Sequence, residues 1–68
     1  MNAVKITTEF IRLDSFLKLA GATFSGGEAK VLIQEGEVAV GGEICLMRGK
    51  KLHPGDTVTV RGTTYQVV

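Results

Sequence analysis

The chain has no covalent or metal staple with which to stabilise a fold. Among its 68 residues there is one cysteine, Cys45, and one histidine, His53. An internal disulfide is therefore impossible, and these two side chains cannot form a zinc site alone. Domains of about this length bury only about 60% of the surface that the unfolded chain exposes. The fold must be held by an apolar core, which a hydrophobic content of 44% permits.

The length predicts a single domain over residues 1–68, because a second hydrophobic core would have nothing to be built from. The N-terminus lacks the apolar run of roughly 7–15 residues that a signal peptide requires. No segment approaches the roughly 20 apolar residues of a membrane span. A lone free thiol also favours a reducing compartment. We therefore expect a cytoplasmic protein with no membrane contact.

The first helix is predicted in RLDSFLKLAG, after an extended start in VKITTEFI. Asp14 precedes Lys18 by four residues, the favourable order for a surface ion pair, and Gly21 is expected to end the helix. The apolar residues recur at i, i+3, i+4 and i+7, the spacing of one buried helix face: Leu13, Phe16, Leu17 and Ala20.

A second helix is predicted in SGGEAKVLIQEG. Ser25 and Glu28 have the spacing of a capping box, in which each side chain satisfies a free amide near the helix start. Gly36 supplies a C-terminal stop. The buried stripe is expected to contain Ala29, Leu32 and Ile33.

After Gly36 the pattern becomes that of strands. EVAVGGEICL alternates apolar residues into Gly41-Gly42, which suits a tight hairpin. Pro54-Gly55 suits a type II turn, and a last hairpin is expected about Arg61-Gly62. The order is a strand, two helices, and then three or four strands. It predicts an α+β fold with two packed helices against a small, mainly antiparallel sheet.

The sequence offers little for catalysis. Cys45 and His53 are the one obvious nucleophile and base, and no third group that would orient the histidine is evident. Cys45 lies in a strand pattern between Ile44 and Leu46, so we expect a buried structural cysteine and a solvated loop histidine. We expect no enzyme, no cofactor, no metal and no small-molecule substrate.

The positive charge is gathered in one short segment. The net charge is +1, but residues 1–37 carry −1 and residues 38–68 carry +2, with three cations in Arg48, Lys50 and Lys51. Such a cluster is either a solvated loop or a contact with an anionic partner.

The four aromatic residues are expected mostly in the core: Phe10, Phe16, Phe24 and Tyr65. Without a stacking platform, recognition of unstacked bases is not expected. Contact with the phosphates and shape of a folded RNA needs no such platform. The glycines of SGGEAK could admit one phosphate near Ser25, although Glu28 would repel it, and a purely structural helix start is the favoured interpretation.

Several short motifs together resemble one family. RLDSFL, then Ser25 with AKVLIQEGEVAVGGE and a closing GD, resembles the RNA-binding domain named after the fourth protein of the small ribosomal subunit, also called the alpha-L motif. The resemblance covers residues 12–58, and SGGEAK, RGKKL and PGD are similar to its small stand-alone bacterial members. The matching positions are Arg12, Leu13, Asp14, Leu17, Ser25, Ala29, Ile33, Gly36, Val38, Val40, Gly42 and Asp56.

The resemblance implies a non-catalytic domain that docks on structured RNA, ribosomal RNA or a ribosome-associated particle above all, with ribosomal proteins as further partners. The RNA-binding residues that it implies are Arg12, Ser25, Lys30, Arg48, Lys50 and Lys51. Gly26 and Gly27 stand where many members carry cations, which implies weaker or more partner-dependent binding. The alternative is a protein-interaction module that uses the basic loop or a sheet edge.

Overall fold

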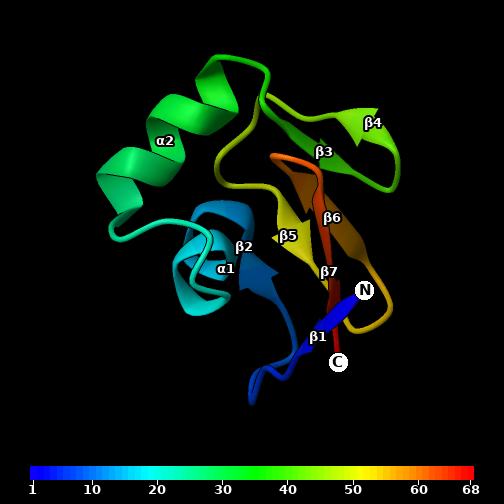
Figure 1. Cartoon of the computed structure of the whole chain (residues 1–68). Helices are drawn as coiled ribbons and strands as arrows, with labels where there is room; N and C mark the ends of the chain where they lie inside the picture. Colours follow the sequence, from blue (N-terminus) through cyan, green and yellow to red (C-terminus); the bar gives the residue numbers. More distant parts are fainter.

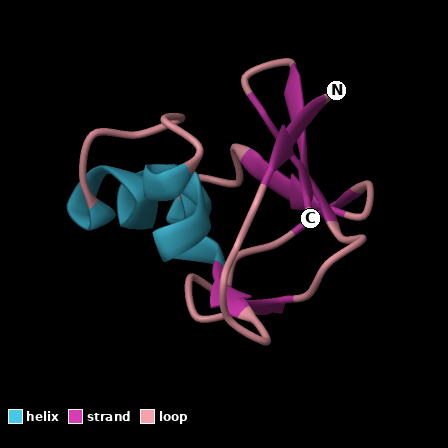
Figure 2. Ribbon diagram, turned by 90° about the horizontal axis from the view of Figure 1, so that it is seen from below, coloured by secondary structure: helices cyan, strands magenta, loops and turns pink.

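Two helices lie side by side on one side of a five-stranded sheet in the computed structural model, which describes residues 1–68 (Figures 1 and 2). The predicted α+β class, with two packed helices and a mainly antiparallel sheet, is confirmed. The elements are β1 (Asn2–Val4), β2 (Ile11–Arg12), α1 (Leu13–Leu19), α2 (Gly26–Gln34), β3 (Val38–Val40), β4 (Glu43–Ile44), β5 (Lys51–Leu52), β6 (Thr57–Val60) and β7 (Thr63–Val67).

The main sheet has the order β1-β7-β6-β3-β4, and all its neighbouring strands are antiparallel except β1 and β7. A separate ribbon is formed by β2 and β5, which pair antiparallel. Figure 2 shows this ribbon apart from the main sheet, next to the helices. Five strands follow the helices, so the expectation of three or four was wrong. The additional strand β5 has only two residues, too few for an alternation of polar and apolar residues that would predict a strand.

The core lies between the helices and the sheet, as the helical periodicity predicts. Phe16 is fully buried, and its ring meets Tyr65 of β7 edge-to-face with 6.5 Å between centroids. The helix faces and the sheet supply most of the other buried apolar side chains: Leu13, Leu17, Ala29, Leu32, Ile33, Val38, Val58, Val60 and Val67. Leu52 of β5 is also fully buried, which anchors the small ribbon to this core.

The tight turns occur where the sequence predicts them. Gly41 and Gly42 both have positive φ, 59° and 86°, and connect β3 to β4 as a two-residue hairpin loop requires. At the turn of Pro54 and Gly55, Asp56 N donates to His53 O (3.0 Å), and Gly55 has φ of 101°. The glycine at each of these sites adopts a conformation that other residues rarely reach.

The segment after β4 differs from its prediction. Ile44 and Leu46 are each 61% exposed, whereas Cys45 is half-buried. The strand ends at Ile44, at the edge of the sheet, so the expected return to Leu46 does not form. The expectation of a buried cysteine was therefore only partly right, and the apolar residues on either side of it face solvent.

The start of α2 is capped as predicted, except that one of the two side-chain bonds goes to the residue before the N-cap. Ser25 Oγ accepts a hydrogen bond from Glu28 N (3.1 Å), as an N-cap serine should. Glu28 Oε1 in turn accepts from Phe24 N (2.8 Å), the residue before the cap. Two backbone amides at the helix start are thereby satisfied by side chains, and Phe24 is left 96% exposed.

We expect Ser25→Ala to lower the free energy of unfolding by about 1 kcal/mol, because it removes the acceptor for Glu28 N. In a domain of this size, that corresponds to a fall in melting temperature of roughly 4–8 °C. Ser15→Ala is the matched control, since Ser15 lies exposed within α1 and its side chain caps nothing. Equal stability of the two variants in urea unfolding would contradict a capping role for Ser25.

Candidate functional site

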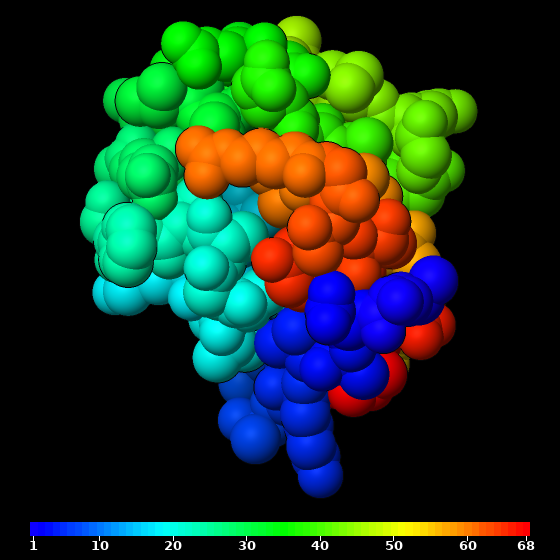
Figure 3. Space-filling view, viewed as in Figure 1, coloured from blue at the N-terminus to red at the C-terminus, as the bar shows by residue number.

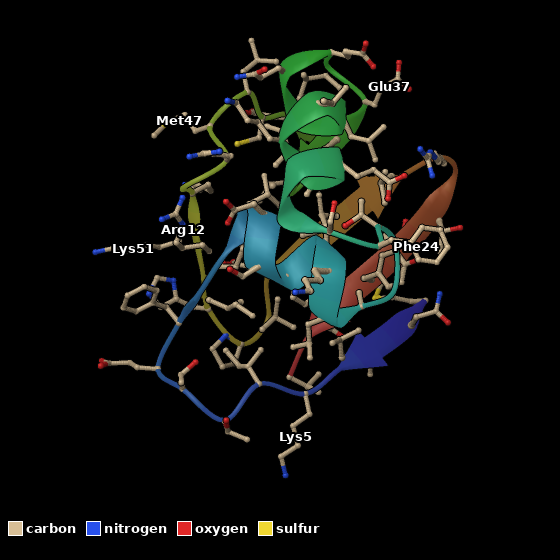
Figure 4. All side chains as sticks on the ribbon, turned by 90° about the vertical axis from the view of Figure 1, so that its left-hand side faces the viewer. Lys5, Arg12, Phe24, Glu37, Met47 and Lys51 are labelled. Atoms are coloured by element: carbon tan, nitrogen blue, oxygen red, sulfur yellow. The ribbon has the colours of Figure 1, made fainter.

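The small ribbon brings two distant cations together. Arg12 of β2 is the direct cross-strand partner of Lys51 of β5, and Ile11 is the partner of Leu52. Because successive residues of a strand point to opposite faces, Arg12 and Lys51 share one face while Leu52 points into the core. Figure 4 shows the side chains of Arg12 and Lys51 projecting on the same side of the molecule.

The loop that precedes β5 is fastened to the start of α1 by its backbone. Leu13 N donates to Lys50 O (2.8 Å), and Asp14 N donates to Arg48 O (3.1 Å). The N-cap residue, Arg12, makes no side-chain cap, so these loop carbonyls satisfy amides that the first turn leaves free. The cations of the loop are consequently held at the N-terminal end of the helix by bonds that do not use their side chains.

The guanidinium of Arg12 lies against the same loop. A Cβ at Gly49 would be 3.7 Å from Arg12 Nη2, an ordinary contact distance. Arg12 therefore lies beside the segment that carries Arg48 and Lys50. We call the set of Arg12, Arg48, Lys50 and Lys51 the basic patch. Figure 3 shows that the opposite side of the molecule is formed largely by α1, α2, β1 and the β6–β7 turn, and that the segment around residue 50 contributes little to it.

One carboxylate accompanies the basic patch. Asp14 Oδ2 lies 3.3 Å from Arg12 Nη2, and Asp14 Oδ1 accepts from Ser15 N (2.8 Å). The predicted pair of Asp14 with Lys18 is therefore wrong. Side chains in the first helical turn lean toward the N-terminus, which turns Asp14 toward Arg12. The Arg12 side chain remains 51% exposed, so a surface pair of this kind leaves it accessible to an anion.

The other cations of the patch have no carboxylate partner. Arg48, Lys50 and Lys51 are exposed, and none takes part in either of the two ion pairs of the structure. An exposed and unpaired cation keeps its full charge available to a ligand.

The remaining two predicted site residues belong to α2. Ser25 is occupied as the cap of this helix, although its hydroxyl hydrogen is free to bond an acceptor. Lys30 is exposed on the same helix, off the buried stripe. No hydrogen bond or ion pair connects either residue to the basic patch, so their membership of one binding surface stays a prediction.

The structure adds two residues that the sequence analysis did not place at the site. Phe10 is 39% exposed, and Lys51 Nζ lies 4.9 Å from the centroid of its ring. The ring of His53 lies 6.2 Å from that of Phe10. The expectation that the aromatic residues are mostly buried fails for Phe10 and for Phe24. The two residues before and after the ribbon strands carry no sequence signal of this placement, because Phe10 and Ile11 are both apolar and each strand has only two residues.

The candidates for catalysis have structural partners. Cys45 Sγ lies 3.7 Å from Met47 O, and Asp56 Oδ2 accepts a hydrogen bond from His53 N (2.7 Å). No group of three or more histidine, cysteine, aspartate or glutamate side chains is arranged to hold a metal ion. None of the helices has the length and apolar character needed to cross a membrane.

Nearly the whole of this chain matches a known family. The profile of the S4 domain matches residues 4–68. The chain belongs to the S4 domain family. The resemblance given by RLDSFL and the motifs after it is thereby confirmed, over a longer range than residues 12–58.

Two relatives and one solved structure illustrate the similarity. The chain is 47% identical to "Probable ribosome maturation protein RlbA" of Bacillus subtilis (strain 168), over 98% of this chain and 96% of the relative. It is 40% identical to "Putative RNA-binding protein YbcJ" of Escherichia coli (strain K12), over 85% and 83% of the two chains. The solution structure of YbcJ from E. coli superposes with a TM-score of 0.76 at 35% identity, covering 100% of this chain and 87% of that one. That structure is described as an alpha-L motif involved in RNA binding.

We expect the variant Arg48→Ala/Lys50→Ala/Lys51→Ala to keep the fold. The loop is held by its carbonyl groups, so the substitutions remove one exposed cation–π contact and no hydrogen bond of the helix start. The free energy of unfolding should stay within about 1 kcal/mol of the wild type. Urea unfolding measures this directly, and a loss of several kcal/mol would show that the side chains support the loop.

Proposed function

We propose that this protein is a non-catalytic RNA-binding domain that docks on structured RNA through the basic patch. The observation that carries the proposal is the convergence of Arg12 with Arg48, Lys50 and Lys51 at the start of α1, although 36 positions separate Arg12 from Arg48 in the sequence. In the proposal, Lys30 and the Ser25 hydroxyl extend the contact along α2.

The relatives support this proposal and suggest its biological setting. One is named for ribosome maturation and another for RNA binding, and the YbcJ structure is described as a motif involved in RNA binding. We infer that ribosomal RNA, or a precursor particle that contains it, is the partner of this chain. A ribosomal partner would also place the protein in the cytoplasm, as its sequence predicts.

The chemistry of such docking is electrostatic. Each cation that neutralises a phosphate releases condensed counterions, which favours binding without reading the base sequence. Folded RNA presents its phosphates at fixed positions, so a rigid arrangement of cations can select a shape. The loop of the basic patch is fixed by two backbone hydrogen bonds to α1, which gives its cations that rigidity.

We expect the logarithm of RNA affinity to fall with the logarithm of salt concentration at a slope of roughly −3.5 to −4.5 if five cations engage phosphates. The Arg48→Ala/Lys50→Ala/Lys51→Ala variant should flatten this slope by roughly two to three units. Lys5→Ala is the matched control, because Lys5 is exposed at another end of the molecule (Figure 4) and should leave the slope unchanged. Titration of purified ribosomal RNA at several salt concentrations measures all three slopes. An unchanged slope in the triple variant would remove the loop from the interface.

Lys30 is tested separately, because no hydrogen bond or ion pair links it to the patch. We expect Lys30→Ala to reduce the salt slope by roughly 0.7–0.9, the share of one phosphate, and to leave unfolding unchanged. The same titration, run beside Lys18→Ala on α1, supplies the comparison. If the Lys30 variant keeps the wild-type slope, the interface is confined to the start of α1.

One observation favours a second candidate function, a protein-interaction module. Ile44, Leu46 and Met47 are all more than 60% exposed and line a shallow groove of about 310 Å³ beside β4, the edge strand of the main sheet. Exposed apolar side chains at a sheet edge are suited to contact another chain. Copurification separates the two functions. Association with ribosomal particles that is lost on nuclease treatment supports RNA binding, whereas nuclease-resistant association with one polypeptide supports the second function.

A further inference from the structure

The outward face of the β2–β5 ribbon alternates aromatic and cationic side chains. The register pairs Arg12 with Lys51, and its continuation by two positions brings Phe10 opposite His53. Residues two apart on a strand share a face, so all four side chains lie on the same side of the ribbon, with Leu52 on the other. We call Phe10, Lys51 and His53 the aromatic cluster. It borders the basic patch and shares Lys51 with it.

The aromatic cluster is exposed to a degree that core packing does not explain. Phe10 is 39% exposed, whereas Phe16 is fully buried, and the side chain of His53 is 58% exposed. The rings of Phe10 and His53 are inclined by 46° with centroids 6.2 Å apart, so neither ring covers the face of the other. Lys51 Nζ lies over the Phe10 ring, 4.9 Å from its centroid. The group over the ring is thus an exposed side chain and not part of the core.

We propose that the aromatic cluster is a binding site for one unpaired base of the RNA that the basic patch holds. The base stacks on the ring of Phe10 beside His53, and the ammonium of Lys51 leaves that ring for a phosphate of the same strand. This proposal rests on the proposed RNA-binding function and adds a contact to it. It also replaces the expectation that this chain contacts RNA through phosphates and shape alone.

Replacing the Lys51 ammonium by a base on the Phe10 ring is favourable both for the ring and for the ammonium. An exposed cation–π contact is weaker than the stacking of a base on an aromatic ring. The Lys51 ammonium gains a phosphate partner in place of the ring, which is a charge-assisted contact. Every base has a π-face, so the site would accept any base that the RNA fold leaves unpaired. A bulge or loop nucleotide next to an RNA helix offers both an unpaired base for Phe10 and phosphates for the cations, since the neighbouring phosphates reach Arg12 and the loop.

Phe24 provides the comparison that the chain itself offers. It is 96% exposed, more than Phe10, but Figure 4 shows it on the side of the molecule opposite Arg12 and Lys51. No cation lies over its ring in the structure, where the one cation–π contact is that of Lys51 with Phe10. A loss of binding caused merely by removing an exposed phenylalanine would appear in variants of both residues, whereas loss of a stacking site would appear only at Phe10.

The test uses two short RNA hairpins that differ only in a single-nucleotide bulge, occupied by 2-aminopurine. We expect the wild-type protein to bind the bulged hairpin more tightly than the paired one, by about 5- to 100-fold, the value of one stacked base. We also expect 2-aminopurine emission to fall on binding as the base stacks. Phe10→Leu should abolish the preference and the emission change while keeping the salt slope, because it removes no charge. Phe10→Trp should restore both effects, and Phe24→Leu should behave as the wild type.

The outcomes separate this site from the proposed function. Tight, salt-dependent binding of both hairpins with no preference, unaffected by Phe10→Leu, refutes the stacking site and leaves the basic patch intact. A bulge preference that persists in Phe10→Leu also refutes it. Failure to bind either hairpin at low salt refutes the proposed function and the stacking site together. Thermal unfolding of each variant confirms that Phe10→Leu leaves the fold in place, as its position outside the core predicts.

Discussion

The attachment of the segment Arg48–Leu52 to the start of α1 is the interaction on which the candidate site depends. Two β2–β5 residue pairs hold the segment in place, together with two hydrogen bonds that the first helical amides donate to loop carbonyls. The arrangement is economical, because a helix start requires acceptors and a loop without strand partners requires donors. Leu52 secures it from the other side by its complete burial. The positions of the cations are consequently determined by the backbone, and their side chains are left for a ligand.

The parts of the fold that the sequence predicts are those with a local physical cause. At the turns, Pro54 fixes φ, and the glycines of Gly41-Gly42 and Gly55 reach the positive φ that the turn requires. At the helix start, Ser25 with Glu28 satisfies amides three and four residues away. The 3.6-residue period predicts the buried faces of both helices because one face of a helix must meet the core. The ribbon of β2 and β5 has no such cause. Each strand has two residues, and their partners are about 40 positions apart, so the pairing is decided by the packing of Leu52 and the closure of the loop.

The candidate site is predictable to the same extent. Its prediction fails where the environment of a residue depends on pairing between distant parts of the chain. The charge of Arg48, Lys50 and Lys51 is visible in the sequence, and the family motif adds Arg12. Most of the aromatic residues were expected in the core, but burial of apolar residues is only a tendency and much of any protein surface is apolar, as at Phe10. Its true environment follows from the register of the ribbon, which brings it opposite His53. Asp14 illustrates the same point, since the spacing to Lys18 is favourable but the contact is made with Arg12.

A nearly neutral chain can still present a strongly cationic surface if its acids are used elsewhere. The carboxylates of Asp14, Glu28 and Asp56 each accept a hydrogen bond from a backbone amide. Such carboxylates serve the local fold, at a helix start or a turn, and part of their charge is offset by the amide dipoles. Of the four cations of the basic patch, only Arg12 has a carboxylate partner, and that pair is exposed on the arginine side. With screening over about 8–10 Å at physiological salt, a phosphate at the patch responds mainly to the charges within that range, and three of the four cations there have no carboxylate partner. The net charge of +1 therefore says little about RNA binding, which depends on how the fold distributes the charges.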